Sequence, residues 1–92
     1  MRPMLLLFVS HGCPACASAR PEWEKYKSKH PLDMLLELDA DGPYAGHLVG
    51  PKPIRVTPLY VLKDGDEVTT HEGAMRAEQI EKWVRAIVGI SR

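Results

Sequence analysis

With 92 residues, the chain is long enough for one domain, expected over residues 1–92, and too short for two domains of ordinary size. Hydrophobic residues make up 45% of it, which excludes a disordered chain. The 12 basic and 12 acidic side chains give a formal net charge of zero, which argues against a general nucleic-acid binder and against a protein held on a membrane surface by charge.

The first predicted element is a strand over residues 4–9, an uninterrupted apolar run of the sequence Met-Leu-Leu-Leu-Phe-Val. Such a run is typical of a strand that is covered on both faces. It is too short for the apolar core of a signal peptide or for a transmembrane helix, and residues 10–13 after it are no small-residue cleavage site. We therefore expect no membrane span and a cytoplasmic location.

A helix is predicted to begin at Cys13, because Pro14 suits the first helical turn, where its missing N–H costs nothing. Four residues at helical spacing form its expected inward face, namely Cys16, Ala19, Trp23 and Tyr26. Pro21 is expected to kink this helix, and His30-Pro31 to end it. Residues 32–38 are predicted to form a second strand. A strand–helix–strand unit of this size favours a parallel strand pair with a right-handed crossover.

Residues 43–50 are predicted to hold a short helix, although Gly46 weakens it. The strands predicted at 59–63 and 67–71 should form a hairpin around Asp64-Gly65. An apolar stripe predicts the last helix, with Gly89 as its end; the stripe consists of Ile80, Trp83, Val84, Ile87 and Val88. The order β-α-β-(α)-β-β-α indicates an α/β domain with a central four-stranded mixed sheet flanked by helices.

The two cysteines, Cys13 and Cys16, lie at the expected junction of strand and helix. A disulfide between them closes a very short loop and constrains the unfolded chain little, so chemistry explains the pair better than stabilisation does. Unpaired N–H groups at a helix start favour a thiolate at Cys13, the predicted nucleophile. Cys16, one turn later, is placed to resolve a mixed disulfide. We predict a thiol–disulfide oxidoreductase whose redox-active disulfide Cys13–Cys16 needs no further cofactor.

Half of a zinc site is the main alternative interpretation of the Cys-x-x-Cys motif. A zinc site needs two further ligands, but the chain has neither a second Cys-x-x-Cys nor a His-x-x-x-His, and its four histidines are scattered. We therefore expect no metal. A non-catalytic or metal-binding module on the same fold is the alternative from another functional class.

Over nearly its whole length the sequence resembles the thioredoxin superfamily. The resemblance is carried by residues 8–16, Pro21, Val56-Thr57-Pro58, residues 59–65 and Glu72-Gly73-Ala74-Met75. It implies a thioredoxin fold with a cis peptide before Pro58, a substrate segment bound by Thr57 and Pro58, and a groove that Gly73 leaves open. It also implies protein disulfides as substrates and recycling by a thioredoxin reductase-type flavoprotein or by glutathione. The missing signal peptide favours reduction as the direction of electron flow. We expect a monomer.

Several features depart from thioredoxin. We expect a fold without the N-terminal strand and helix of full-length thioredoxins, and Gly12 stands where a tryptophan is usual before the first cysteine. Leu7 replaces a buried aspartate and Leu35 replaces the lysine near it, so the usual proton acceptor for Cys16 is missing. The family's route for deprotonating Cys16 therefore does not transfer to this sequence.

Two neighbours of the cysteines are candidates for tuning the site. An imidazolium at His11 would lower the pKa of Cys13 and a neutral imidazole would accept a proton, whereas the other interpretation of His11 is an exposed loop residue. Pro14 directly follows the first cysteine, as in glutaredoxins. A glutaredoxin-like electron donor, recycled by glutathione or serving ribonucleotide reductase, is therefore the alternative function, although residues 64–67 resemble a hairpin turn and not a glutathione site.

Overall fold

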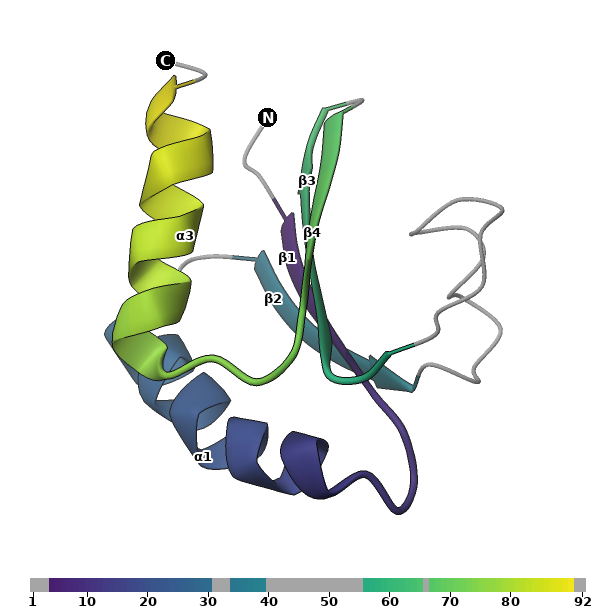
Figure 1. The fold of residues 1–92 in the computed structure, drawn as a ribbon. Helices are drawn as coiled ribbons and strands as arrows, with labels where there is room; N and C mark the ends of the chain where they lie inside the picture. Colours follow the sequence, from purple (N-terminus) through teal and green to yellow (C-terminus); the bar gives the residue numbers. More distant parts are fainter. Residues whose placement is uncertain (1–3, 31–33, 40–55, 66, 91–92) are drawn as a thin grey trace.

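The structure is a computed structural model that describes residues 4–30, 34–39, 56–65 and 67–90. Its elements in chain order are β1 (Met4–Val9), α1 (Pro14–Lys29), β2 (Met34–Asp39), β3 (Leu59–Asp64), β4 (Glu67–Glu72) and α3 (Ala77–Ile90) (Figure 1). The described strands form a four-stranded sheet in the order β2-β1-β3-β4. β1 is parallel to β2 and antiparallel to β3, and β3 is antiparallel to β4. The predicted mixed sheet is therefore present.

β1 lies inside the sheet, and its side chains are buried on both faces. Leu5, Leu7 and Val9 belong to the hydrophobic cluster that includes residues of α1 and α3. Because side chains alternate along a strand, Leu6 and Phe8 point to the opposite face, where both are fully buried. Burial on both faces is why the sequence of this strand is a continuous apolar run and does not alternate.

α1 packs on the sheet through the face that its sequence spacing predicts. The buried residues of this helix are Cys16, Ala19, Trp23 and Tyr26. The helix continues through Pro21, and the N–H of His30 caps its end by donating to the carbonyl of Lys27 at 3.1 Å. On the outer side, Arg20 Nε lies 3.8 Å from Glu37 Oε2 on β2.

α3 lies on the same face of the sheet as α1 (Figure 1). Ile80 is fully buried, and the other apolar residues of the predicted stripe, Trp83, Val84, Ile87 and Val88, pack partly buried against the core. The prediction that Gly89 ends the helix is wrong, because the helix continues to Ile90. A glycine inside a helix costs only about 1 kcal/mol, which the packing of the apolar stripe outweighs. The short helix predicted at 43–50 lies outside the described residues.

The predicted ends of the later strands differ by one residue each. β2, β3 and β4 extend one residue beyond the predicted ends, to Asp39, Asp64 and Glu72, and residues 32–33 of the second predicted strand lie outside the described residues. Gly65 sits in the turn of the hairpin with φ at 64°, a left-handed conformation that glycine adopts without strain. This agrees with the turn predicted from Asp64-Gly65.

Candidate active site

Cys13 and Cys16 are joined by a disulfide at the N-terminus of α1. Cys13 is the N-cap residue and is half-buried, whereas Cys16 lies one turn into the helix and is only 2% exposed. Pro14 occupies the first turn and is exposed. Cys13 is therefore the more exposed of the two cysteines.

The turn that carries the chain from β1 to Cys13 depends on glycine. Gly12 has φ at 68°, in the left-handed region that side chains rarely adopt. A Cβ at this position would meet no heavy atom within 4 Å, so backbone conformation and not crowding favours glycine here. His11, in the same turn, is exposed.

Three polar atoms surround the sulfur of Cys13. The N–H of Cys16 donates to it at 3.1 Å, and the hydroxyl of Thr57 lies 3.4 Å from it. The carbonyl oxygen of Thr57 is 3.5 Å away. A disulfide sulfur has no proton to give, so this last contact becomes a hydrogen bond only when Cys13 is a thiol. The first two contacts favour a thiolate, and the third favours the protonated form.

Thr57, Pro58 and Gly73 are brought to the cysteines by the antiparallel strands. The peptide bond between Thr57 and Pro58 is cis, and Pro58 is buried. The N–H of Gly73 donates to the carbonyl of Pro58 at 2.9 Å. Gly73 has φ at 96°, and a Cβ there would meet no heavy atom within 4 Å. The residue therefore borders open space.

A hollow of about 390 Å³ lies beside the disulfide. It is lined by Ser10, His11, Gly12, Cys13, Pro14, Cys16, Ala17 and Arg20. Its charged or titratable side chains other than the cysteines are therefore His11 and Arg20, both exposed. His11 thus borders the same hollow as Cys13, while no hydrogen bond between the two joins them in the described part of the chain.

These features agree with a comparison of the sequence with protein families: the model of the thioredoxin-like domain matches residues 1–87. The chain belongs to the thioredoxin-like domain family. A comparison with curated proteins finds no significant match.

Solved thioredoxin structures share the fold of this thioredoxin-like domain. Chloroplastic thioredoxin z has a TM-score of 0.76 at 22% identity, over 96% of this chain and 80% of its own. The periplasmic thioredoxin SoxS from Paracoccus pantotrophus, in its reduced form, has a TM-score of 0.72 at 22% identity, over 99% of this chain and 100% of its own. Fasciola hepatica thioredoxin has a TM-score of 0.73 at 24% identity, over 91% of this chain and 80% of its own. The predicted α/β thioredoxin fold is confirmed.

The surroundings of Cys16 in this thioredoxin-like domain are apolar. Leu7 is fully buried and belongs to the same cluster as Cys16, and no charged side chain is buried in the described ranges. Leu35 lies on β2 beside Leu5 of β1. Two buried phenols, Tyr26 and Tyr60, belong to the same cluster, and the Tyr60 hydroxyl accepts a hydrogen bond from the N–H of Met75 at 3.1 Å. Burial raises the pKa of Tyr60, so this phenol stays neutral.

Sequence reasoning missed Ser10 and the hydroxyl of Thr57. Ser10 Oγ lies 2.8 Å from Thr57 Oγ1. A signal was present, because Ser10 follows β1 and Thr57 precedes β3. The pairing of Phe8 with Leu59 in this antiparallel ladder, continued outward, sets Ser10 and Thr57 opposite each other. This signal can be used only when the antiparallel pairing of β1 with β3 is known, and the local sequence does not predict that pairing.

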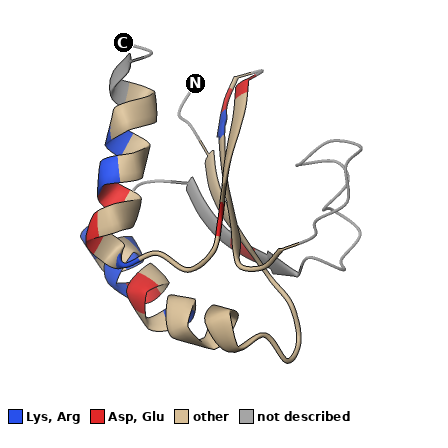
Figure 2. Ribbon diagram, in the orientation of Figure 1, with Lys and Arg blue, Asp and Glu red and all other residues tan. Residues whose placement is uncertain are grey.

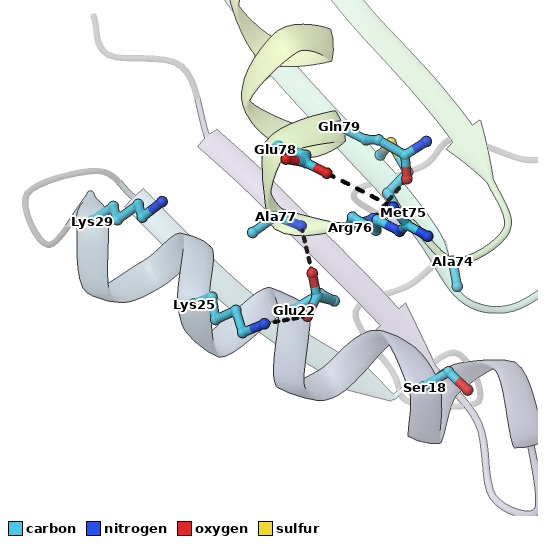
Figure 3. A pocket seen from close by; sticks show the side chains of 10 residues that line it. All are labelled: Ser18, Glu22, Lys25, Lys29, Ala74, Met75, Arg76, Ala77, Glu78 and Gln79. Atoms are coloured by element: carbon cyan, nitrogen blue, oxygen red, sulfur yellow. Dashed lines mark hydrogen bonds and ion pairs between the residues drawn. The ribbon is translucent and has the colours of Figure 1, made fainter.

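A second, larger hollow of about 710 Å³ lies between α1 and the start of α3 (Figure 3). Glu22 reaches across it: one carboxylate oxygen accepts from the N–H of Ala77 at 3.1 Å and the other contacts Lys25 Nζ at 2.9 Å. These contacts hold the pKa of Glu22 below its usual value, Lys25 contributing more than Ala77. Gln79 caps the N–H of Arg76 at 2.8 Å. The N–H groups of Ala77 and Arg76 and the ammonium group of Lys25 are thus already paired, and the bond from Ala77 to Glu22 joins the two helices across the hollow.

Two further findings concern metals and membranes. Across the described segments of the chain, no group of three or more histidine, cysteine, aspartate or glutamate side chains is arranged to hold a metal ion. Among the same residues, neither helix combines the length and the apolar character that crossing a membrane requires.

Proposed function

We propose that this thioredoxin-like domain is a thiol–disulfide oxidoreductase that reduces disulfides in other proteins. The observation that carries the proposal is the Cys13–Cys16 disulfide, with one half-buried and one buried sulfur at the start of a helix. An accessible sulfur among N–H donors suits a nucleophile, and a shielded sulfur one turn later suits a resolving thiol.

The proposed reaction has two exchange steps. The Cys13 thiolate attacks one sulfur of a substrate disulfide, which forms a mixed disulfide and releases the other substrate sulfur as a thiolate that takes up a proton. The Cys16 thiol then loses its proton, and its sulfur attacks Cys13, which closes the Cys13–Cys16 disulfide and releases the second substrate thiol. Two electrons pass from the cysteine pair to the substrate, and of the two protons that the substrate sulfurs take up, one corresponds to the proton lost by Cys16 and the other comes from solvent.

The surface around the cysteines supports a protein substrate. Pro14, Ala15 and Ala17 are exposed and uncharged, and the charged side chains of α1 begin at Arg20 (Figure 2). Val56, next to Thr57, is an exposed apolar side chain at 43%. This partly apolar border, in which His11 and Arg20 are the charged or titratable side chains of the hollow besides the cysteines, suits contact with a polypeptide segment. Within the proposal, Thr57 and Pro58 bind the backbone of that segment and Gly73 leaves room for it.

The direction of electron flow, the recycling partner and the cytoplasmic location are further parts of the proposal, and the recycling partner can be tested directly. Oxidised protein is supplied either with a thioredoxin reductase-type flavoprotein or with glutathione, and its return to the dithiol is followed. Recycling by the flavoprotein is expected; recycling by glutathione alone would make the protein glutaredoxin-like.

Trapping tests the reaction itself. A Cys16→Ser variant is expected to accumulate mixed disulfides through Cys13, because the resolving thiol is absent, and the matched Cys13→Ser variant is expected to trap none. The unchanged protein should reduce insulin disulfides with a dithiol as electron source. A Cys16→Ser variant that traps no protein, together with an unchanged protein that does not reduce insulin, would contradict the proposal.

A further inference from the structure

Two hydroxyl groups lie in a row that ends on the Cys13 sulfur. Ser10 Oγ is 2.8 Å from Thr57 Oγ1, and Thr57 Oγ1 is 3.4 Å from Cys13 Sγ. Ser10 and Thr57 are both half-buried, which limits the water available to replace either contact. The three side chains come from three segments of the chain, the end of β1, the residue before Pro58 and the N-cap of α1.

Counting protons fixes how this row is oriented. Each hydroxyl has one proton to donate, and a thiolate has none and accepts. When Thr57 donates to the sulfur of Cys13, its oxygen is left as the acceptor for Ser10, so Ser10 must be the donor in the first contact. The reverse orientation would direct an oxygen lone pair at the sulfur. A negative charge on Cys13 therefore selects the orientation in which both protons point toward it.

We propose that Ser10 is a positioning residue that holds the Thr57 hydroxyl in the orientation donating to the Cys13 thiolate. The inference rests on the proposed function, in which that thiolate is the reacting form. Ser10 does not touch the sulfur and acts through Thr57. A hydroxyl that receives a hydrogen bond is polarised and becomes a better donor, so the Ser10 contact strengthens the Thr57 contact to sulfur.

The hydroxyl row matters because the other contacts of the sulfur oppose one another. The Cys16 N–H favours the thiolate, whereas the Thr57 carbonyl oxygen accepts from the thiol and favours the protonated form. His11 and Arg20 border the same hollow, but both are exposed, so solvent and salt weaken their effect. The Thr57 hydroxyl is a neutral, half-buried donor to the sulfur, and its hydrogen bond adds to the stabilisation of the thiolate over the thiol.

The test measures the pKa of Cys13 in the reduced full chain. The rate at which iodoacetamide alkylates Cys13 is followed against pH, with the modified cysteine identified by peptide mass spectrometry. Thr57→Val removes the donor and should raise the pKa of Cys13 by about one unit. Ser10→Ala should raise it by about 0.3 unit, because one supporting bond of the row is lost. Ser10→Thr, which keeps a hydroxyl, should leave it near the unchanged value.

The double variant separates positioning from independent effects. In the Thr57→Val background, Ser10→Ala should cause no further shift, because Ser10 then has no hydroxyl to orient. Ser18→Ala, an exposed serine on α1, is the matched control and should shift nothing. Equal Ser10→Ala shifts in both backgrounds would overturn the proposal, and so would lower thermal stability of Ser10→Ala with an unchanged pKa of Cys13.

This titration uses no protein substrate. A chain that reduces no protein disulfide would therefore overturn the proposed function, and the coupling between Ser10 and Thr57 would still be measured. Conversely, insulin reduction with no coupling would overturn the Ser10 proposal and leave the function standing.

Discussion

The two cysteines are three positions apart and have the same side chain, yet their surroundings give them different chemistry. Cys13 accepts from a helix N–H and lies beside a hydroxyl, and both contacts stabilise negative charge. Cys16 is buried among apolar side chains, and burial without a partner raises the pKa of a thiol. These surroundings support the roles that the proposed function gives the two residues, Cys13 as the attacking sulfur and Cys16 as the resolving one.

The apolar site around Cys16 predicts how a carboxylate would behave there. Leu7 is fully buried at the position where the resemblance to thioredoxin implies an aspartate. In a Leu7→Asp variant, burial should raise the pKa of the new carboxyl above its unfolded value of about 3.9. Relative to a variant with a neutral side chain, Leu7→Asp is then most stable below the unfolded pKa of the carboxyl. It loses this stability as the pH rises through the folded pKa.

Leu7→Asn is the matched variant, because it loses the same packing and does not titrate. The free energy of unfolding of both should be measured in urea from acidic to neutral pH. The Asp variant should fall below the Asn variant as pH rises, by about 1.4 kcal/mol for each unit by which the pKa is raised. Parallel curves for the two variants would mean that water or a polar partner reaches this site.

Between elements, the antiparallel pairing of β1, β3 and β4 assembles the site. The pairing of β1 with β3 sets Ser10 beside Thr57, and the loop after β4 returns to the same end of the sheet (Figure 1). Two hydrogen bonds fix that loop: Gly73 N–H to the carbonyl of Pro58, and Met75 N–H to the hydroxyl of Tyr60. The open side of the site therefore depends in part on the buried Tyr60.

A Tyr60→Phe variant should weaken this loop. Removing the hydroxyl leaves the buried N–H of Met75 without its partner, which should lower the free energy of unfolding by about 1–3 kcal/mol. The pKa of Tyr60 is raised, first by burial and further by Glu22, against the opposing Met75 hydrogen bond. Stability from neutral Tyr60 is therefore fully present below its unfolded pKa of about 10 and is lost as pH rises through the folded value.

The measurement compares the unchanged protein and Tyr60→Phe in urea at neutral and alkaline pH. The difference between them should be largest at neutral pH and should shrink as the pH exceeds about 10. A difference that does not change with alkaline pH would show that the phenol ionises equally in the folded and unfolded chain.

The local sequence predicted the elements better than it predicted the contacts between them. The apolar run of β1, the inward face of α1 and the Asp64-Gly65 turn depend on neighbours in sequence, and the structure agrees with each. The hydrogen bonds of Ser10 with Thr57 and of Met75 with Tyr60 join segments far apart in the chain. No periodicity signals such contacts. Gly89 was misjudged for a related reason, since propensity was weighed without tertiary packing.

At the scale of the molecule, charge and reactivity are separated. The charged side chains of the helices gather on the second half of α1 and along α3, whereas the turn after β1 and the first turns of α1 carry none (Figure 2). Ion pairs such as Lys25 with Glu22 and Arg85 with Glu81 lie on the charged part. Exposed pairs of this kind contribute little stability, so their main effect is on solubility. Within the described residues, the first turn of α1 thus carries the disulfide without a charged side chain, and Arg20 borders the hollow beside it.

The stability of the whole molecule is linked to the direction of electron flow. Reduction and unfolding form a closed thermodynamic cycle. The free energy of unfolding of the oxidised protein therefore differs from that of the reduced protein by an amount set, through ΔG = −nFΔE, by the difference in reduction potential between the folded and the unfolded cysteine pair. Closing so short a loop contributes roughly 2 kcal/mol of chain entropy to the oxidised form. The donors to the Cys13 thiolate act in the opposite sense, because they stabilise the reduced form.

For the proposed reductant, the disulfide must be favoured in the folded protein, so we expect the oxidised form to be more stable by on the order of 1–2 kcal/mol. Urea midpoints with and without an excess of dithiol measure this, provided that the slopes of the two unfolding curves agree. A variant with both Cys13→Ser and Cys16→Ser is the control, because dithiol should not shift its midpoint. A more stable reduced form would mean that the contacts of the Cys13 thiolate outweigh loop closure, and the protein would then be an oxidant of its partners.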